Sequence, residues 1–431
     1  MSQIGFLADD LTGAADVLAQ AHAYGLEAML VLDPHHAVPD RADVVGVAGP
    51  IRSMAGAELD GFVRTGLRAL SGLPLSVLIY KICSTFDSSP TAGNIGRAIE
   101  LLHEQFPRHG SIPVVPAQPA FGRYTAFSQH IGVYNGEAYR LDRHPVMSSH
   151  PSTPMTEADL RLVLAAQFTA PVTPIGIHLP RFVDGTFTDA WERARRSNDP
   201  AFVVDAVDED QMDRVAAALR TEQEAPALVV GSGGIMSALA RGFDVRPAAE
   251  PDRTAATGPT LVVSASASAT SDAQIEDAVA AGWSEVPIPP DALGTADRAV
   301  APVGDWVDAV QEALRVGRHV VAHTTRGGSD PRLTGSATRT AAEVGNTIGR
   351  LAGAMARSGL THNIAICGGD TSSHALLALG VTELRVSEQF VTAGPVCVVD
   401  AQSDAAGCRL LLKGGQVGPP DIFRRFAGCV D

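Results

Sequence analysis

The sequence predicts an α/β protein made of two α/β domains with mainly parallel sheets. Its 431 residues are enough for two or three domains at about 150 residues each. Short apolar runs alternate with helical stretches of about 10–15 residues, a pattern typical of parallel sheets covered by helices. A polar, proline-containing stretch, RPAAEPDRTAATGP, interrupts this alternation and ends at Pro259. We therefore predict one domain at 1–242, a linker at 243–259 and a second domain at 260–431.

The first predicted domain starts the alternation at once. After the strand Ile4–Leu7, the spacing of Val17, Ala21 and Tyr24 predicts a helix. The segment Tyr134–Thr156 is rich in His, Pro and Ser and has no clear period, so we expect a long loop or lid there. The other predicted strands are Ala28–Leu32, Val44–Val47, Leu75–Tyr80, Pro113–Val115, Phe202–Val204 and Leu228–Val230. The other predicted helices are Leu59–Leu70, Ile95–Leu102, Gln211–Leu219 and Ile235–Ala240.

The second predicted domain repeats the alternation after the linker, without a repeat of fixed period. Its first strand is Leu261–Val263, and a helix begins near Asp272. Later helices are predicted at Thr338–Ser358 and from Ser373 onward. The other predicted strands are Val320–His323, Ile364–Ile366 and Val396–Val399.

Charge and cysteine content limit the partners and the compartment. A formal net charge of −15 gives no general attraction to nucleic acids or anionic lipids, although a local pocket for a small anion remains open. The start MSQIGFLADDLTG has no basic segment of a signal peptide, and no run of about 20 apolar residues is present. The 5 cysteines form no CxxC pair and the histidines are scattered. We therefore expect a reduced, cytoplasmic protein without a structural metal site or a nucleic-acid or membrane partner.

The first motif, ADDLTGAAD at Ala8–Asp16, directly follows a predicted strand. Ligands of open α/β sheets bind beyond the carboxyl ends of the strands. One interpretation is a helix cap formed by Asp10 or Thr12. The other is a polyol site, in which carboxylates accept hydrogen bonds from hydroxyls and one carboxylate acts as a base. Both interpretations remain open.

The second motif, KICSTFDSSPTAGNIG at Lys81–Gly96, also follows a predicted strand. A lysine, several hydroxyls and a Gly-Asn pair at a helix start suit the carboxylate or phosphate of a small acid. The alternative is a capped helix with a surface lysine. Cys83 has no histidine beside it in the sequence, which favours a small buried residue over a nucleophile.

Turns rich in glycine or serine follow several predicted strands. The first domain has GSGG at Gly231–Gly234. The second domain has SASAS at Ser264–Ser268, CGGDT at Cys367–Thr371 and KGGQVG at Lys413–Gly418. GSGG is neither a P-loop nor a GxGxxG motif. Each turn alone is as readily a plain turn, but three in one domain favour phosphate binding by backbone N–H groups without a P-loop.

Taken in order, these motifs resemble those of the four-carbon acid sugar kinase family, formerly a domain of unknown function. ADDLTGAAD resembles the family's ADDLTGAND, PAQPAFGRYT its PAFPAxGRTT, and HPSTPMTEADL the segment after its lid. VVSASAS resembles VVSGSxS, CGGDTS resembles GGDTA, and LKGGQVG resembles LKSGNFG. The resemblance covers nearly the whole chain. It implies an N-terminal domain that holds a sugar acid, a C-terminal domain that holds ATP, and a ligand cleft between them.

The resemblance further implies a kinase that uses ATP and Mg²⁺ to phosphorylate a terminal hydroxyl of threonate, erythronate, 3-oxo-tetronate or a related acid. Lys81 and Arg52 would bind the carboxylate or keto oxygen, Asp10 would be the base, and Asp370 would reach Mg²⁺; another aspartate as the base remains open. The implied acid-site residues are Asp9, Asp10, Asp16, Arg52, Lys81, Ser84, Thr85 and Arg123. The implied nucleotide-site residues are Ser264, Ser266, Gly368, Gly369, Asp370, Thr371, Gly414 and Gly415.

The second motif departs from the family pattern KxDSTxRGNxG. Cys83 stands where the family has Asp, and FDSSPTA stands where it has one residue and Arg. This variant resembles a branch of the family that acts on 3-oxo-isoapionate, because a pocket that trades Asp for Cys is less polar and could admit a branch carbon. The alternative is that Asp87 or Ser88 supplies equivalent contacts, which would leave a straight-chain 3-oxo-tetronate, threonate or erythronate kinase.

Two functions of other classes remain open. A non-catalytic protein that binds a sugar acid and a nucleotide would keep both sites without turnover. A dinucleotide-dependent oxidoreductase would retain NAD, but the missing GxGxxG motif argues against it. The oligomeric state is not readable from the sequence, and a homodimer remains open.

Overall fold

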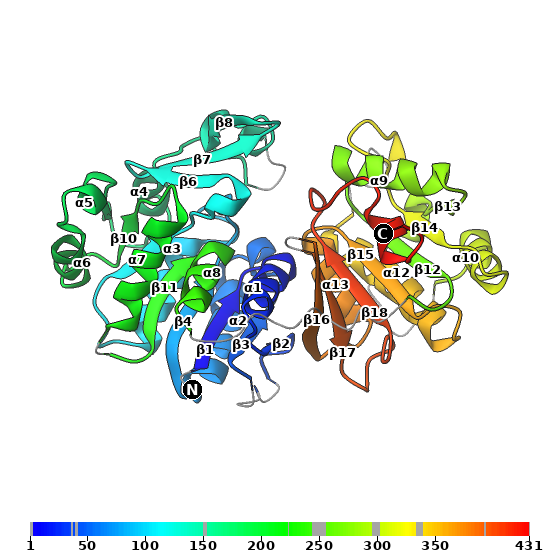
Figure 1. Cartoon of the computed structure of the whole chain (residues 1–431), viewed down its shortest axis with the longest axis horizontal. Helices are drawn as coiled ribbons and strands as arrows, with labels where there is room; N and C mark the ends of the chain where they lie inside the picture. The colour runs from blue at the N-terminus through cyan, green and yellow to red at the C-terminus, as the bar shows by residue number, and fades with distance from the viewer. Residues whose placement is uncertain are drawn as a thin grey trace. The chain divides into compact units, whose positions relative to one another are not determined.

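The computed structural model describes residues 3–35, 38, 42–149, 153–222, 224–243, 256–294, 302–332, 339–391 and 394–430. The chain forms two compact units: unit 1 comprises Met1–Ala28 and Asp33–Pro247, and unit 2 comprises Met29–Leu32 and Ala248–Asp431. Each unit contains a largely parallel sheet and helices, so the predicted α/β class is confirmed (Figure 1). The predicted linker at 243–259 lies mostly outside the described residues.

Unit 1 contains a parallel sheet whose strands are buried on both faces, as expected where helices cover both sides. The strand order is β3-β1-β4-β11-β5-β10-β9. Ala8 at the end of β1 lies opposite Ala48 of β3 and Lys81 of β4. Residues that follow these three strands therefore meet at one edge of the sheet. The strands are β1 (Gln3–Ala8), β3 (Val44–Ala48), β4 (Leu75–Lys81), β5 (Ile112–Val115), β9 (Ile175–Ile177), β10 (Ala201–Val204) and β11 (Ala227–Gly231).

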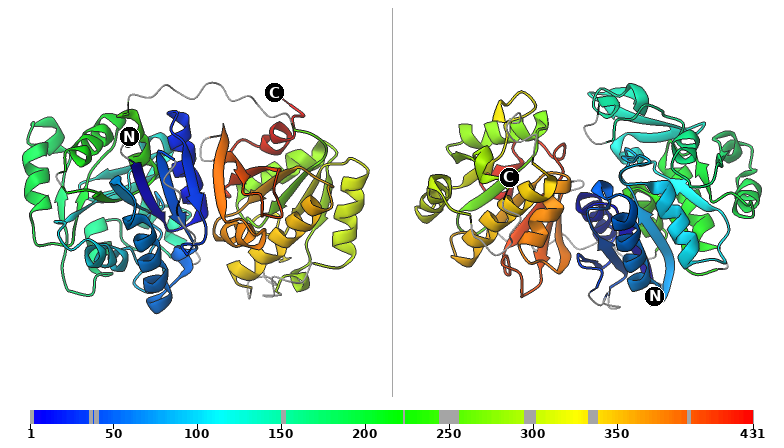
Figure 2. Two further views of the ribbon diagram at one scale, coloured as in Figure 1. Left: turned by 90° about the horizontal axis from the view of Figure 1, so that it is seen from below. Right: turned by 180° about the vertical axis from the view of Figure 1, so that it is seen from behind.

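Helices cover both faces of this sheet (Figure 2). Leu59 of α2, Ile99 of α3 and Leu164 of α4 share one core with strand residues such as Val45 and Leu78. On the other face, α8 packs against both α1 and α7. The helices are α1 (Leu11–Ala23), α2 (Gly56–Ser71), α3 (Ile95–Gln105), α4 (Leu160–Ala165), α5 (Pro180–Val183), α6 (Phe187–Arg195), α7 (Glu209–Arg220) and α8 (Gly233–Arg241). Short 3₁₀ helices are η1 (Ile51–Ser53), η2 (Pro119–Phe121), η3 (Leu141–Arg143) and η4 (Met147–Ser149).

Unit 1 also contains a small antiparallel sheet, drawn in cyan in Figure 1. It consists of β6 (Arg123–Ala126), β7 (Gln129–Tyr134) and β8 (Glu137–Arg140). The prediction of a loop over Tyr134–Thr156 is therefore wrong for β8, although η3 and η4 follow it and 150–152 lie outside the described residues. The missed signal is the pair Asn135–Gly136, whose φ angles of 51° and 82° suit a tight hairpin turn.

Unit 2 combines parallel and antiparallel strands in the order β13-β14-β12-β15-β18-β17-β16-β2. Five neighbouring strands, β13, β14, β12, β15 and β18, run parallel to one another. The next strands, β17, β16 and β2, each pair antiparallel with their neighbour. Met29–Leu32 belongs to unit 2, although the sequence boundaries assign it to the first domain. The strands are β2 (Ala28–Val31), β12 (Thr260–Ser264), β13 (Ser284–Pro287), β14 (Val320–His323), β15 (Asn363–Cys367), β16 (Glu383–Val391), β17 (Gly394–Val399) and β18 (Arg409–Lys413).

Two helices of unit 2 begin at side-chain caps, and its helices bury apolar residues. Ser268 caps α9 and Thr340 caps α12, each with its side-chain oxygen on a backbone N–H of the first turn. Ile275 of α9 and Phe423 of α14 share a core with strand residues such as Val262, and α12 packs along α13. Within the described ranges, every helix is too short or too polar to cross a bilayer. The helices are α9 (Ala269–Ala280), η5 (Pro290–Ala292), α10 (Asp305–Arg315), α12 (Ala341–Arg357), α13 (Asp370–Ala378) and α14 (Ile422–Phe426).

Candidate active site

Charged side chains gather where β1, β3 and β4 of unit 1 end. Asp9 and Asp10 follow β1, Arg52 lies in η1 after β3, and Lys81 is the last residue of β4. The backbone ties these ends together: the Arg52 N–H donates to the Asp9 carbonyl at 3.0 Å, and the Asp9 N–H donates to the Lys81 carbonyl at 3.0 Å. These residues and Asp87 form what we call the acid cluster.

Three carboxylates surround the guanidinium of Arg52. Its Nη2 lies 2.9 Å from Asp10 Oδ1 and 3.7 Å from Asp9 Oδ1, and its Nη1 lies 3.4 Å from Asp87 Oδ2. Burial alone would lower the pKa of Arg52, but Asp10 and Asp9 raise it well above its usual value. Arg52 is therefore a permanent cation held by protein carboxylates.

Asp10 is the helix cap that the sequence analysis gave as one interpretation of the first motif. Its Oδ1 accepts a hydrogen bond from the Gly13 N–H at 2.8 Å and so caps α1. A Cβ at Gly13 would lie 2.5 Å from that oxygen and 2.6 Å from Lys81 Nζ, so only glycine allows this close approach. Lys81 is 2% exposed and donates to the Ile82 carbonyl at 2.8 Å. The interpretation of Lys81 as a surface lysine is therefore wrong.

Asp9 is held less firmly than Asp10, because its Oδ1 reaches Arg52 only at 3.7 Å. Asp9 Oδ1 is buried and has no hydrogen-bond partner among the described residues. The pKa of Asp9 is raised to about 7: burial is the largest cause, Asp10 and Asp87 also raise it, and Arg52 and Lys81 lower it. Asp9 is thus a carboxyl group that exchanges its proton near neutral pH.

The chain after β4 forms a tight loop beside the cluster. Cys83 Sγ lies 2.9 Å from Thr85 Oγ1. Burial and the charge of Asp87 raise the pKa of the Cys83 thiol to about 12, so the thiol keeps its proton. Asn94 caps α3, as the alternative interpretation of this motif expected. A Cβ at Gly93, whose φ is +57°, would lie 2.8 Å from the Arg52 carbonyl oxygen, so the loop closes directly on Arg52.

The small sheet contributes Arg123 and His130. The His130 ring lies 2.7 Å from the Ser84 carbonyl through Nε2 and 2.9 Å from Thr125 Oγ1 through Nδ1. Burial lowers the pKa of His130 to about 4, so the ring is neutral and donates to Ser84. Arg123 Nη1 donates to three backbone carbonyls, whereas its Nε is buried without a partner among the described residues. His130 was missed in the sequence because no local motif signals its contact.

Asp16 does not join the acid cluster. Its carboxylate accepts hydrogen bonds from Gln20 and Gln118, both at 3.1 Å. A Cβ at Gly233, the first residue of α8, would lie 2.0 Å from Asp16 Oδ2. The carboxylate therefore sits against the positive end of α8 and ties the GSGG turn to α1. The structure places Asp16 in the scaffold of unit 1.

The three predicted turns of unit 2 come together in what we call the turn cluster, formed by 264–268, 367–371 and 413–418. Ser264 lies opposite Cys367, and Cys367 opposite Lys413, at the ends of neighbouring parallel strands. The Ser268 and Ser271 hydroxyls donate to the Gly415 carbonyl. A Cβ at Gly415 would lie 2.3 Å from Ser266 Oγ. The first and third turns therefore touch.

The glycines of the turn cluster have different surroundings. Gly368 has a φ of +157°, and a Cβ there would lie 2.3 Å from Thr371 Oγ1. A Cβ at Gly369 would meet no heavy atom within 4 Å, so its backbone borders open space. Gly414 accepts a hydrogen bond from the Val417 N–H. Asp370 begins α13, but its side chain lies outside what the structure describes.

Lys413 is a residue of the turn cluster that the sequence analysis did not select. It is 1% exposed, and its Nζ has no hydrogen-bond partner among the described residues. Burial lowers its pKa, and its Nζ lies 5.8 Å from the centre of the Phe423 ring. Ser264 Oγ and Thr371 Oγ1 are also buried without a partner in that part of the chain. These three groups favour an anionic ligand at the turn cluster.

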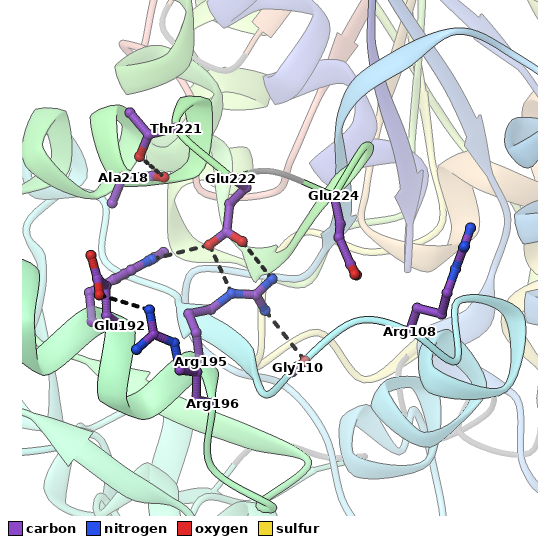
Figure 3. Close-up of a pocket in the computed structure, with 10 residues that line it drawn as sticks. Arg108, Gly110, Glu192, Arg195, Arg196, Ala218, Thr221, Glu222 and Glu224 are labelled. Carbon is purple, nitrogen blue, oxygen red and sulfur yellow. Dashed lines mark hydrogen bonds and ion pairs between the residues drawn. The ribbon is translucent and has the colours of Figure 1, made fainter.

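A separate cavity of about 530 Å³ lies in unit 1 (Figure 3). Its residues come before β5, β10 and β11, so it lies at the amino ends of those strands, away from the edge where ligands of such sheets bind. Two of its arginines are already paired, since Arg195 contacts Glu222 at 2.8 Å and Arg196 contacts Glu192 at 3.0 Å. The cavity is lined by Arg108, Gly110, Trp191, Glu192, Arg195, Arg196, Ala218, Thr221, Glu222 and Glu224.

No group of three or more His, Cys, Asp and Glu side chains within the described ranges is arranged to hold a metal ion. The acid cluster and the turn cluster differ in the groups that they offer a ligand. Their chemistry is a dense set of hydrogen-bond acceptors and cations in unit 1 and a set of glycines and hydroxyls in unit 2.

Two family models match the chain over most of its length. A sugar-binding N-terminal domain matches residues 4–239, and a nucleotide-binding C-terminal domain matches residues 261–423. The 3-oxo-isoapionate kinase of Paraburkholderia graminis is 32% identical over 97% of this chain and 93% of its own. A 3-oxo-tetronate kinase of Cupriavidus necator is 31% identical over 97% of this chain and 95% of its own.

Solved structures with low sequence identity share the fold. A Salmonella typhimurium LT2 protein superposes with a TM-score of 0.79 at 22% identity, covering 99% of this chain and 98% of its own. A Haemophilus influenzae protein superposes with a TM-score of 0.72 at 20% identity, covering 99% of both chains. At this level of identity, these likenesses establish the architecture alone.

The two family models and the curated relatives place the chain in the class of sugar-acid kinases. The chain belongs to the four-carbon acid sugar kinase family, as the resemblance of its motifs implied. It is a kinase, and membership of this family implies a sugar acid and ATP as its two substrates.

Proposed function

We propose that this kinase phosphorylates a terminal hydroxyl of the branched acid 3-oxo-isoapionate. The observation that carries the proposal is the acid cluster, in which Asp9, Asp10 and Asp87 converge on Arg52 beside Lys81. Such a set of acceptors and cations suits a small acid with several hydroxyls. The 32% identity to a 3-oxo-isoapionate kinase over 97% of the chain supports the choice of acid. Straight-chain 3-oxo-tetronate, threonate or erythronate is the alternative.

We assign the acid to residues 1–242 and the nucleotide to residues 260–431, with 243–259 as the linker. The descriptions of the two matching family models support this division. All 5 cysteines are unpaired, which supports work in a reducing compartment, and we propose the cytoplasm. The homodimer stays a prediction, and a measurement of the molecular mass in solution would test it.

The carboxylates around Arg52 change which residues we expect to bind the carboxylate of the substrate. Arg52 and Lys81 were expected to bind it, but Arg52 already faces three protein carboxylates. Donors without a full set of partners are the ammonium of Lys81 and the Nε atoms of Arg52 and Arg123. Because the charge of Arg52 is already balanced by carboxylates, we propose that Lys81 and Arg123 stabilise the added anion. Arg52 then orders the aspartates, and the hydroxyls of Ser84 and Thr85 are available to the hydroxyls of the acid.

The geometry also favours Asp9 over Asp10 as the base. Asp10 Oδ1 is occupied by the cap of α1 and by Arg52 at 2.9 Å, while Asp9 Oδ1 lies 3.7 Å from Arg52 and accepts no hydrogen bond among the described residues. A base works best when its pKa lies near the working pH, and the pKa of Asp9 is about 7. In our proposal Asp9 accepts the proton of the attacking hydroxyl, and Asp10 holds Arg52 and α1 in place.

The turn cluster would hold the phosphates of ATP. Phosphoryl transfer depends mainly on positioning and on neutralising charge, and backbone N–H groups at strand-to-helix turns supply both. We propose that Ser264, Ser266, Gly368, Gly369, Thr371, Gly414 and Gly415 form this site. Mg²⁺, when bound, would neutralise phosphate charge, and we propose Asp370 as the residue that reaches it.

The test is a coupled ADP-release screen over a panel of four-carbon and branched five-carbon sugar acids. The proposal predicts that ADP release depends on an acid of this panel and is fastest with 3-oxo-isoapionate. Nucleotide binding with no acid-dependent ADP release would contradict a kinase and favour a non-catalytic binding protein. Fastest release with 3-oxo-tetronate, threonate or erythronate would leave a kinase of the alternative specificity.

A further inference from the structure

Asp87 lies in the acid cluster but was not among the residues expected there. It is 5% exposed, and its Oδ2 lies 3.4 Å from Arg52 Nη1. Its Oδ1 is buried and has no hydrogen-bond partner among the described residues. Leaving such an acceptor buried and unpaired is unfavourable. The position therefore suits a ligand that donates a hydrogen bond to Asp87.

The loop around Asp87 is fixed on both sides. Phe86 before it is fully buried and has a φ of +58°, a strained value for a bulky residue that only firm packing maintains. Ser88 after it donates to the Phe86 carbonyl at 3.1 Å and accepts from Gln167 at 2.9 Å. Gln167 in turn accepts from the Gly96 N–H of α3. Asp87 is thus directed toward Arg52 by a rigid loop.

Cys83 is the second side chain of this loop that we consider. Cys83 precedes Asp87 in the same loop between β4 and α3, and the charge of Asp87 helps burial to raise the pKa of the Cys83 thiol. A protonated thiol is small and a weak hydrogen-bonding group. Cys83 therefore offers a weakly polar surface in the loop that also carries the strong acceptor Asp87. A carbon branch that carries a hydroxyl would match both groups, whereas an unbranched acid would match one.

We propose that Asp87 is a specificity-determining residue, whose free carboxylate oxygen accepts a hydrogen bond from a hydroxymethyl branch of the sugar acid that packs against Cys83. This inference rests on the proposed function, and it names the part of the acid that the site selects. Asp87 acts on the choice of acid, and the turn cluster handles ATP independently of it.

The test compares kcat/KM for 3-oxo-isoapionate and 3-oxo-tetronate in the wild type and in Asp87→Asn. The substitution is isosteric and removes one charged acceptor, so kcat/KM for the branched acid should fall about ten- to hundredfold. The value for the straight-chain acid should fall less than about threefold, because it does not use this oxygen. KM for ATP should stay unchanged.

A matched control distinguishes a role of Asp87 in the choice of acid from the general effect of losing an ion pair. Asp277→Asn removes a carboxylate that contacts Arg424 at 2.6 Å in unit 2, and it should leave the ratio of the two acids unchanged. An equal fall for both acids in Asp87→Asn would show that Asp87 only holds Arg52, and would overturn the inference. If Asp87→Asn does not fold, Asp87→Glu keeps the charge but displaces the acceptor, and the same change in ratio is expected.

The failure of this inference and of the proposed function give different results. A wild-type enzyme that releases ADP with neither acid overturns both. A wild-type enzyme that is active, together with an Asp87→Asn variant that keeps the same ratio, overturns the specificity role alone.

Discussion

The acid cluster of unit 1 and the turn cluster of unit 2 use different chemical groups. The acid cluster is made of charged side chains, three carboxylates around one guanidinium with a buried lysine beside them. The turn cluster is made of glycines and hydroxyls, in which Gly415 touches Ser266 and Gly368 touches Thr371. Lys413 is its one buried cation among the residues that we assign to it.

This difference explains where the chain departs from its family pattern. Sites formed by side chains change their preference with one or two substitutions, as at Cys83 and Asp87. A site formed by backbone at close contact has little freedom, because any added Cβ meets a neighbour or the ligand. The departure therefore falls on the acid side, while the nucleotide motifs remain close to the family pattern.

The largest expected effect is on the turn cluster. Gly369→Val should abolish ATP binding, because the side chain would occupy the open space that the backbone borders. The fold should be kept, since a Cβ there meets no atom within 4 Å. The measurement is ATP affinity by calorimetry together with a thermal melt. Gly61→Val on α2, which also faces open space, is the control and should bind ATP normally. Unchanged affinity in Gly369→Val would remove the turn cluster from the nucleotide role.

The next effect separates the two aspartates that follow β1. Asp9→Asn should lower kcat about 10²- to 10⁴-fold, the usual range for loss of a general base. Asp10→Asn should lower it less, because asparagine also caps helices and Asp10 acts through Arg52. Steady-state kinetics on both variants make the comparison. A larger fall in Asp10→Asn would return the base to Asp10, and a fall below about threefold in Asp9→Asn would exclude Asp9.

A smaller effect concerns stability and pH. Unfolded Asp9 releases its proton near pH 3.8 and folded Asp9 near pH 7, so the folded state holds an extra proton between these values. The stability contributed by protonated Asp9 is present below the unfolded pKa and is lost as the pH rises through the folded pKa. Asp9→Asn should therefore gain stability over the wild type between about pH 4 and pH 8, by an amount on the order of a few kcal/mol. Urea unfolding at several pH values measures the gain, and a pH-independent difference would contradict the raised pKa.

Most strands were predictable because buried parallel strands are continuous apolar runs, such as Leu75–Tyr80 and Val320–His323. The hairpin of β7 and β8 was missed because its central residues are polar and its Asn135–Gly136 signal was not used. The partner of β2 could not be predicted, since Met29 pairs with Arg385 far along the chain. Strand formation is local, but strand pairing depends on the tertiary fold.

The candidate sites show the same limit. The motifs located Asp9, Asp10 and Lys81, the family resemblance implied Arg52, and strand register then explains why they meet. Three features depend on packing that no motif records: the burial of Lys413 near Phe423, the cap that occupies Asp10, and the contact of Asp87 with Arg52. Asp87 appeared in the sequence analysis only as an alternative source of equivalent contacts.

The most direct test of the account is the ratio of kcat/KM for 3-oxo-isoapionate to that for 3-oxo-tetronate, threonate and erythronate, measured on one preparation of the wild-type enzyme with KM for ATP determined alongside. The side chains at Cys83 and Asp87 should favour the branched acid by at least about tenfold, because one charge-assisted contact of about 1.5–3 kcal/mol is enough for that ratio. KM for ATP should not depend on the acid. Equal or better turnover of a straight-chain acid would contradict the claim that these side chains select a branched substrate, while the enzyme would remain a sugar-acid kinase.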